Sequence, residues 1–151
     1  MENLLLSVED NPDDVLILRL AFEKAKLSAR FEFLSDGEQA IDYFSTVLNK
    51  PLPTLLLLDI KLPRKSGMEV LAWIREQPSL KRLPIIMLSA SNRPEDIDQA
   101  YDLGANSYLV KPSRVEELVE LTKTIDSYWF QVNARPTVAP VRQGPGLESR
   151  L

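Results

Sequence analysis

The sequence predicts an α/β fold in which helices cover both faces of a parallel β-sheet. Short apolar runs alternate along the chain with segments in which apolar residues recur every three or four positions. Acidic, proline or serine residues bound the apolar runs, which is typical of strands buried on both faces. Regular alternation of strands and helices indicates parallel strands joined by right-handed crossovers. The length of 151 residues is close to the usual size of one domain.

Five strands and five helices are expected. The strands are apolar runs at residues 4–8, 55–58, 85–88 and 108–110, with a weaker candidate at residues 31–34. The segments between and after them carry apolar stripes at helical spacing. The stripes are Val15, Leu18, Phe22 and Ala25; Ala40, Ile41, Phe44 and Leu48; Gly67, Leu71 and Ile74; Ile97, Ala100, Tyr101 and Leu103; and Val115, Leu118, Thr122, Ile125 and Trp129.

Local signals support the helix ends and mark the loops. Pro94 suits the first turn of the fourth helix, Gly104 suits the position after its end, and residues 113–116 (Ser-Arg-Val-Glu) indicate a capping box for the fifth. Residues 49–53 contain two prolines and predict a stiff loop before the third strand. From Ala134 onward there are three prolines, two glycines and no apolar periodicity. We therefore expect a domain over residues 1–133 and a flexible tail over residues 134–151, with no output domain.

Composition excludes several classes of protein and of site. The 18 basic and 22 acidic residues give a net charge of −4, unlike the basic balance of nucleic-acid binders. No apolar run approaches the roughly 20 residues that span a bilayer, and the first residues lack the basic segment of a signal peptide. The absence of cysteine suits a reducing compartment, so we expect a cytoplasmic protein. The absence of both cysteine and histidine leaves only oxygen ligands for a metal ion.

Chemically active side chains follow four of the predicted strands. In an open parallel sheet, ligands bind beyond the carboxyl ends of the strands. Glu9 and Asp10 follow the first strand, Asp59 the third, Ser89 the fourth and Lys111 the fifth. Three neighbouring carboxylates repel one another unless a proton or a cation intervenes, and Mg²⁺ is the expected ion. A carboxylate beside Mg²⁺, a hydroxyl and an ammonium group is equipped to attack a phosphoryl group and form an acyl phosphate.

Each of these residues alone has an ordinary structural interpretation. An acid after a strand is commonly a solvated loop residue or a helix cap, a serine there a turn residue, and a lysine a surface charge. Asp13 and Asp14 are expected to cap the first helix, since they lie in its first turn. A suitable side chain at each of four strand ends is a far rarer coincidence, and this favours a functional site.

The same residues lie in segments that resemble the receiver domain of two-component response regulators. The resemblance extends from about residue 4 to residue 129 and implies a flavodoxin-like, doubly wound sheet of five strands in the order 2-1-3-4-5 with five helices. The segments that carry it are Val8–Pro12, Leu58–Pro63, Gly67, Ser89 and Ala90, Gly104 and Ala105, and Tyr108–Pro112.

The resemblance assigns the metal and phosphoacceptor roles. It implies that Asp59 accepts the phosphoryl group. It also implies that Asp10, Asp59 and the backbone carbonyl of Lys61 bind Mg²⁺, or Mn²⁺ in its place, while Glu9 acts through water. Glu9 departs from the more common Asp, and Lys61 and Ser91 stand at variable positions that are thought to tune dephosphorylation.

Further roles concern the phosphoryl group and the switch. The resemblance implies that Ser89 and Lys111 bind the phosphoryl oxygens and that Tyr108 is a switch residue whose rotamer follows Ser89. It also implies a cis peptide bond between Lys111 and Pro112, which an X–Pro bond adopts at a cost of roughly 0.5–1 kcal/mol.

A narrower resemblance involves the end of the chain. Residues 127–130, at the end of a long last helix, are similar to the corresponding segment of small response regulators paired with phytochrome kinases. This implies a histidine kinase partner, such as a bacteriophytochrome, and a homodimer formed through the last strand and helix and the C-terminal extension. Tyr128, Trp129 and Phe130 are the candidate dimer contacts; the alternative, that Trp129 simply packs at the helix end, stays open.

We therefore expect a single-domain response regulator that accepts phosphate on Asp59 and signals through phosphorylation-dependent protein contacts rather than as an enzyme. The alternative is a receiver-like binding module that never takes phosphate. A phosphatase or flavin protein is disfavoured. Lys61 stands where an aspartate-nucleophile phosphatase needs a second Asp, and residues 11–14 would repel a phosphate. No glycine-rich phosphate loop is present.

Overall fold

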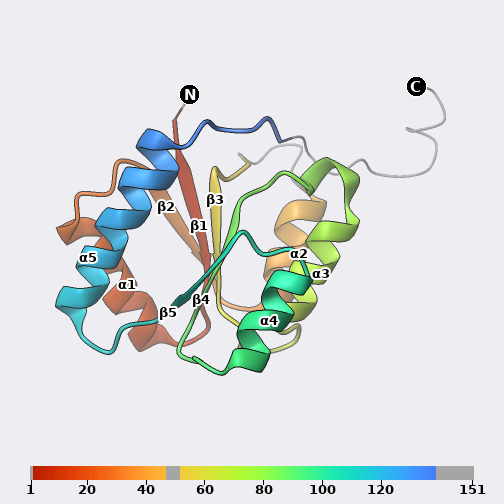
Figure 1. The fold of residues 1–151 in the computed structure, drawn as a ribbon, viewed down its shortest axis with the longest axis horizontal. Helices are drawn as coiled ribbons and strands as arrows, with labels where there is room; N and C mark the ends of the chain where they lie inside the picture. The colour runs from red at the N-terminus through yellow and green to blue at the C-terminus, as the bar shows by residue number, and fades with distance from the viewer. Residues whose placement is uncertain (1, 47–51, 139–151) are drawn as a thin grey trace.

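The computed structural model describes residues 2–46 and 52–138. A five-stranded sheet lies at its centre, with all strand pairs parallel and the order β2-β1-β3-β4-β5 (Figure 1). This confirms the predicted fold class. The strands are β1 (Leu4–Val8), β2 (Arg30–Leu34), β3 (Leu55–Leu58), β4 (Ile85–Ser89) and β5 (Ser107–Val110).

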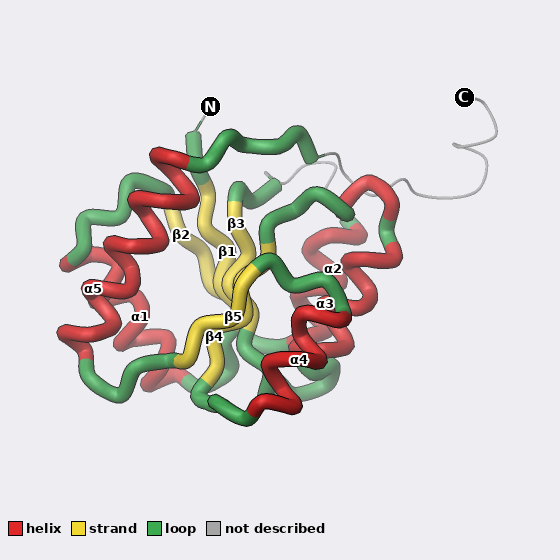
Figure 2. Tube along the Cα trace, in the orientation of Figure 1, coloured by secondary structure: helices red, strands yellow, loops and turns green. Residues whose placement is uncertain are grey.

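Helices cover both faces of this sheet, as expected for a doubly wound fold. Figure 2 shows α1 and α5 on one side of the sheet and α2, α3 and α4 on the other. A short 3₁₀ helix follows α3, and a π-helical segment continues α5. The helices are α1 (Pro12–Lys24), α2 (Gly37–Ser45), α3 (Gly67–Glu76), η2 (Pro78–Leu80), α4 (Pro94–Asp102), α5 (Val115–Ile125) and η3 (Asp126–Val132).

The sheet divides the hydrophobic core into two layers. Successive residues of a strand point to opposite faces. Leu6 and Leu56 are register partners in β1 and β3 and belong to the cluster beneath α2, α3 and α4, whereas Leu5 and Leu55 belong to the cluster beneath α1 and α5. All residues of β1, β3 and β4 are buried, which is why their sequences are apolar without alternation.

The helix ends agree with the sequence in part. Pro94 is the first residue of α4, and Gly104, with φ +105°, follows its last turn. The capping box predicted at residues 113–116 is wrong: Arg114 is the N-cap of α5 and makes no capping side-chain hydrogen bond. A capping box is instead formed at α3 by Ser66 and Glu69, which the sequence analysis did not predict.

The start of α1 also differs from expectation. Asn11, not an aspartate, is the N-cap, and its Oδ1 accepts hydrogen bonds from the backbone N–H groups of Asp13 (2.8 Å) and Asp14 (3.2 Å). An asparagine oxygen at this position satisfies the same amides that an aspartate would. The side chain of Asp14 is consequently available for the site described below.

The chain after α5 winds into a wider turn. Asn133 donates a backbone hydrogen bond to Tyr128, a spacing of five residues. The buried carboxylate of Asp126 accepts from Ser28 N–H (3.1 Å) and from Gln131 Nε2 (2.8 Å). The Asp126–Gln131 contact also spans five residues, so it suits the π-helical winding.

Residues 134–138, the first part of the expected tail, contact the domain. Figure 1 shows the segment after η3 crossing the edge of the sheet where β1 begins. Arg135 Nη1 donates to Asn3 Oδ1 (3.1 Å), and Val138 packs against the core cluster under α2 and α3. Residues 139–151 of the tail, Leu48 and most of the predicted stiff loop at 49–53 lie outside the described residues. Among the helices that are described, none is long and apolar enough to cross a membrane.

Candidate functional site

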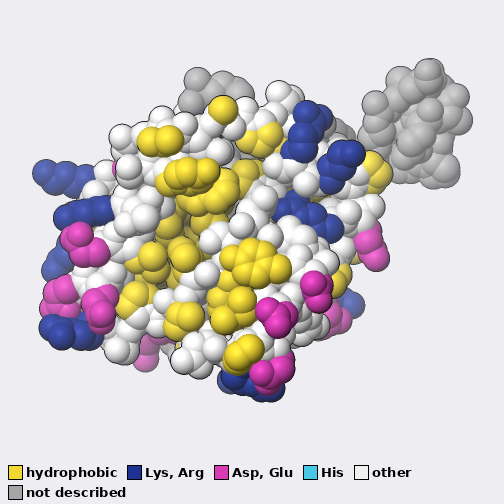
Figure 3. All heavy atoms as spheres, viewed as in Figure 1, with side chains coloured by type: hydrophobic (Ala, Val, Ile, Leu, Met, Phe, Trp, Pro, Cys, Tyr) yellow, Lys and Arg dark blue, Asp and Glu magenta, His cyan; other side chains and the backbone are white. Residues whose placement is uncertain are grey.

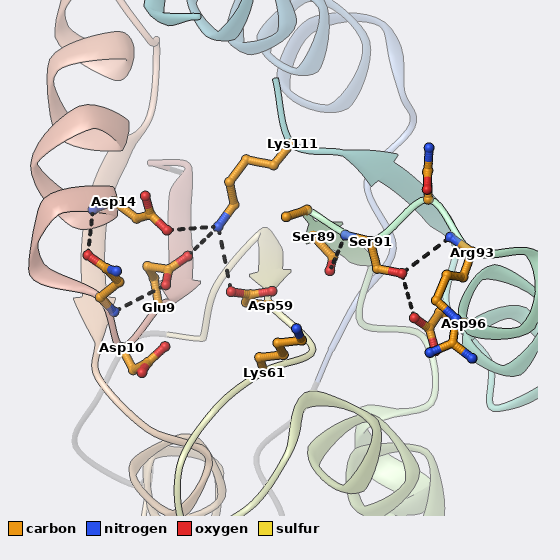
Figure 4. A pocket seen from close by; sticks show the side chains of 13 residues that line it. Glu9, Asp10, Asp14, Asp59, Lys61, Ser89, Ser91, Arg93, Asp96 and Lys111 are labelled. Carbon is orange, nitrogen blue, oxygen red and sulfur yellow. Dashed lines mark hydrogen bonds and ion pairs between the residues drawn. The ribbon is translucent and has the colours of Figure 1, made fainter. Parts of the chain in front are cut away.

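The side chains predicted to form a site line one pocket at the carboxyl ends of the strands. The pocket has a volume of about 500 Å³ (Figure 4). It contains all the predicted metal-binding and phosphoryl-binding residues, together with several residues that were not predicted. Its lining residues are Glu9, Asp10, Asn11, Asp14, Asp59, Lys61, Ser89, Ala90, Ser91, Asn92, Arg93, Asp96 and Lys111.

Backbone hydrogen bonds that continue the sheet place these residues. Glu9 N–H donates to Leu34 across β1 and β2, and Asp59 N–H donates to Val8 across β3 and β1. Lys111 N–H donates to the carbonyl of Ser89 at 2.7 Å. The site is therefore built on the ends of rigid strands rather than on free loops.

Three carboxylates meet at the centre of the pocket. Glu9, Asp10 and Asp59 each offer an oxygen, and these oxygens lie within 4.8 Å of one another. Two ligands of an octahedral Mg²⁺ ion stand roughly 2.9 to 4.2 Å apart, so a small contraction would bring Asp10 and Asp59 to ligand distance, with Glu9 close enough to act through a water. Hard carboxylate oxygens are also the donors that Mg²⁺ prefers. The residues present thus fit a divalent cation.

Lys111 balances part of this negative charge. Its Nζ lies 2.6 Å from Glu9 Oε1, 3.4 Å from Asp14 Oδ2 and 3.5 Å from Asp59 Oδ2 (Figure 4). The other oxygen of Glu9 accepts from Asn11 N–H at 3.2 Å. Asp59 Oδ1 accepts from Ile60 N–H at 2.7 Å. Both carboxylates are thereby held in orientation by the backbone and by one shared ammonium group.

For both Glu9 and Lys111, burial and neighbouring opposite charges shift the pKa in opposite directions. Burial raises the pKa of Glu9, which is 2% exposed; Lys111 counteracts the shift without cancelling it, and the charge of Asp59 adds to it. Burial by itself would lower the pKa of Lys111, but its hydrogen bond to Glu9 and the charges of Asp59, Glu9 and Asp14 outweigh that effect and raise it. Lys111 is therefore firmly cationic, and the buried Glu9 depends on it for neutralisation.

The hydroxyl of Ser89 faces the same pocket from the end of β4. Ser89 is buried, and its Oγ accepts a hydrogen bond from Ser91 N–H at 3.2 Å. Tyr108, on β5, is half-buried and its hydroxyl donates to the carbonyl of Ser91 at 2.8 Å. Ser89 and Tyr108 thus do not contact each other through a hydrogen bond but both bind the same loop residue.

Sequence reasoning missed the place of Asp14 and Asp96 in this region, and it noted Ser91 only as a variable position thought to tune dephosphorylation. Asp14, expected to cap α1, lies beside Lys111. Ser91 and Asp96 are joined by a side-chain hydrogen bond in the wall of the pocket. The available signal was the closeness of Asp14 to Glu9 and Asp10 in the sequence, since α1 begins at Pro12, directly after its N-cap Asn11.

The expected cis peptide between Lys111 and Pro112 is wrong for this structure. The described residues contain no cis peptide bond, so this bond is trans. The trans form is the lower in energy by about 0.5–1 kcal/mol. In that form Lys111 still bonds Ser89 through its backbone and reaches Glu9 with its side chain, so neither contact requires the cis isomer.

The three candidate dimer contacts are not equivalent. Trp129 and Phe130 are half-buried and pack against the cluster under α1 and α5, whereas Tyr128 is 51% exposed. Val132, at the end of the same segment, is 70% exposed. Trp129 therefore packs at the helix end, as the simpler interpretation held, and Tyr128 and Val132 are the apolar side chains that this segment presents to solvent.

Comparison with known proteins extends the resemblance. The family model of the response regulator receiver domain matches residues 5–123. The probable methanogenesis regulatory protein FilR2 of Methanothrix harundinacea is 36% identical over 135 residues, which cover 88% of this chain and 87% of that protein. Response regulator Rcp1 of Synechocystis sp. is 32% identical over 136 residues, which cover 88% of this chain and 92% of Rcp1.

Solved structures agree with these sequence matches. The phosphorylated cyanobacterial phytochrome response regulator RcpA superposes with a TM-score of 0.83 at 33% identity, covering 91% of this chain and 100% of RcpA. The Mn²⁺-bound form of Rcp1 superposes with a TM-score of 0.81 at 32% identity, covering 89% of this chain and 99% of Rcp1. From the match of most of its length to the family model, and from these relatives, the chain belongs to the receiver domain family of response regulators.

Proposed function

We propose that this response regulator accepts a phosphoryl group on Asp59 from a phosphohistidine of a partner histidine kinase, in a Mg²⁺-dependent reaction in the cytoplasm. The observation that carries the proposal is the convergence of Glu9, Asp10, Asp59 and Lys111 in one pocket. The 151 residues contain no histidine, so the donor phosphohistidine lies outside them.

The reaction is a displacement at phosphorus. A carboxylate oxygen of Asp59 forms a bond to phosphorus, the bond from phosphorus to the donor nitrogen breaks, and its electron pair leaves with the imidazole. Asp10, Asp59 and the carbonyl of Lys61 would hold Mg²⁺, with Glu9 acting through water. When bound, the ion neutralises charge on the phosphoryl oxygens. Lys111 would turn from Glu9 and Asp59 toward one phosphoryl oxygen, and Ser89 would donate to another.

The product carries the signal. Converting the Asp59 carboxylate to an acyl phosphate adds roughly one negative charge and several strong hydrogen-bond acceptors. Ser89 would be drawn toward these acceptors, and the loop that it shares with Tyr108 would follow. A downstream protein that binds the shifted arrangement more tightly would then stabilise it. The phosphoacceptor is thus proposed as a switch rather than as an enzyme.

The proposal predicts a Mg²⁺-dependent covalent adduct. We expect the full chain, incubated with acetyl phosphate and Mg²⁺, to gain the mass of one phosphoryl group in intact-mass spectrometry. Excess chelator should suppress the gain, because the carboxylates around Asp59 then repel the incoming anion. No adduct in the presence of Mg²⁺ would instead favour the receiver-like binding module. A phosphorylated phytochrome-type kinase in place of acetyl phosphate tests the proposed partner, which the resemblance to RcpA supports.

A homodimer through the β5 and α5 face and the C-terminal extension is also proposed. Figure 3 shows hydrophobic side chains gathered over β5 between α4 and α5. Tyr101 and Val110 are exposed in this region, and Tyr128 and Val132 are exposed on η3. An exposed apolar area of this kind is typical of a surface that binds another protein.

The dimer makes a separate prediction. Replacing both Tyr128 and Val132 by Ser is expected to raise the dimer dissociation constant by about tenfold or more, because two apolar side chains no longer leave water on association. Sedimentation equilibrium measures this. Leu16→Ser on α1, where the side chain is 65% exposed, is the matched control and should leave the constant unchanged. Equal dissociation constants for wild type and the double variant would contradict this interface, and a protein that stays monomeric would contradict the dimer.

A further inference from the structure

Ser91 connects three parts of the molecule through three different groups. Its backbone N–H donates to Ser89 Oγ (3.2 Å), and its carbonyl accepts from the hydroxyl of Tyr108 (2.8 Å). Its own hydroxyl donates to Asp96 Oδ2 at 2.5 Å and accepts from Arg93 N–H at 3.3 Å. One residue of the loop between β4 and α4 therefore binds the phosphoryl-binding serine, the switch tyrosine and the first turn of α4.

The bond to Asp96 is the anchor of this loop. Asp96 lies in the first turn of α4, whose N-cap residue Arg93 makes no capping side-chain hydrogen bond. The guanidinium group of Arg93 forms its ion pair with Glu95 at 2.9 Å, whereas the carboxylate of Asp96 accepts the hydrogen bond of the serine hydroxyl. Figure 4 shows Ser91 and Asp96 in the wall of the pocket, on the side of Ser89 that faces away from Lys111. A hydrogen bond to a charged acceptor is stronger than one between neutral groups.

This arrangement resists the movement that phosphorylation demands. If Ser89 moves toward a phosphoryl group on Asp59, either its bond from Ser91 N–H breaks or the loop follows. If the loop follows while α4 keeps its place on the core through the buried Ala100, Ser91 leaves Asp96. In either case one hydrogen bond of the resting arrangement is lost, from Ser91 N–H to Ser89 or from the Ser91 hydroxyl to Asp96.

We propose that Asp96 is a positioning residue which, by binding the Ser91 hydroxyl, holds the loop between β4 and α4 in its resting arrangement and lowers the affinity of the site for a phosphoryl group. The inference rests on the proposed function of Asp59 and Ser89. Asp96 does not touch the reacting atoms; it acts through Ser91. Loss of the contact should raise the population of the arrangement that binds the phosphoryl group, and the apparent affinity rises in proportion to that population.

The test uses beryllofluoride, a tetrahedral mimic of an acyl phosphate, with the full chain and Mg²⁺ in isothermal titration calorimetry. We expect Asp96→Ala and Ser91→Ala each to bind it about three- to tenfold more tightly than wild type. The double variant should gain no more than either single variant, since both changes remove one interaction. Asp96→Asn, whose neutral amide oxygen still accepts from Ser91 through a weaker hydrogen bond, should gain less affinity than Asp96→Ala.

Asp98→Ala is the matched control. Asp98 is an exposed acid on the same helix, and its loss changes the net charge equally without touching Ser91. An equal gain in Asp98→Ala would show a general charge effect and overturn the proposal, as would unchanged or weaker binding by Asp96→Ala. Damage to the fold would weaken the binding of beryllofluoride, so tighter binding by Asp96→Ala distinguishes loss of the Ser91 contact from such damage. If wild type binds no beryllofluoride, the proposed function fails and the inference with it; if wild type binds and the variants do not differ from it, only the inference fails.

Discussion

Replacing Asp59 by Asn is expected to abolish the phosphoryl adduct while leaving the fold intact. The amide nitrogen has no free electron pair to attack phosphorus, so labelling by acetyl phosphate should fall by more than about a hundredfold. The amide is nearly the same size as the carboxylate, and its oxygen still accepts from Ile60 N–H, as Asp59 Oδ1 does at 2.7 Å. Removing one of the clustered negative charges should not lower stability, because Lys111 keeps its shorter contact with Glu9.

The measurement is intact-mass spectrometry after incubation with acetyl phosphate and Mg²⁺, combined with thermal unfolding. Asp13→Asn is the matched control, because Asp13 is exposed in the first turn of α1 and makes no ion pair with Lys111 among the described residues. It should label like wild type. An adduct that persists in Asp59→Asn, located elsewhere by peptide mapping, would show that another side chain is the phosphoacceptor.

Gly67→Ala is expected to damage both the fold and the site. A Cβ atom at Gly67 would lie 1.9 Å from the carbonyl oxygen of Asp59 and 2.8 Å from Ile60 Cα. Both neighbours are backbone atoms, so no side-chain rotation relieves the clash. Gly67 N–H also donates to the carbonyl of Ile60 at 2.8 Å, which holds the start of α3 against the segment that follows β3 and carries Asp59. We expect a loss of about 2–4 kcal/mol in the free energy of unfolding and a displaced Asp59.

Chemical denaturation measures the stability loss, and the rate of adduct formation measures the displacement. Gly104→Ala is the control: Gly104 has φ +105°, so alanine is strained there by about 1–2 kcal/mol, but its neighbour is the side chain of Arg75, not the pocket. This variant should lose stability and keep the labelling rate of its folded fraction. If folded Gly67→Ala labels at the rate of wild type, the close approach does not position Asp59.

Sequence patterns predicted the wholly buried strands clearly, whereas the edge strand β2 was only a weak candidate. β1, β3 and β4 lie beneath helices on both faces, so their residues are almost all apolar. β2 is an edge strand whose residues are only partly covered. Arg19 Cζ lies 5.6 Å from the ring centre of Phe31 and 5.1 Å from that of Phe33. The sequence of the strand alone does not indicate that an arginine of α1 covers these rings.

Helix starts show the limit of local motifs. Residues 66–69 and 113–116 both begin with serine and end with glutamate three positions later. Only Ser66 and Glu69 form the capping box, because α5 begins one residue later, at Val115, with Arg114 as its N-cap. The register of a helix start is decided by how the helix packs, and the two sequences alone do not distinguish the outcomes.

The sequence by itself determined the sheet, its two covering layers and the residues that meet at its carboxyl edge, because parallel strands bring their ends together whatever the loops do. Only the tertiary structure decided which partners those residues choose. Lys111 is closest to Glu9, and Asp14 joins them from α1. A change of a few tenths of an ångström in the distance between two groups can make or break a hydrogen bond or ion pair. Here the two groups belong to segments as far apart in the sequence as residues 9 and 111. Hydrophobic periodicity indicates which side of each helix or strand is buried, whereas the distances between side chains of different segments are set only by how those segments pack.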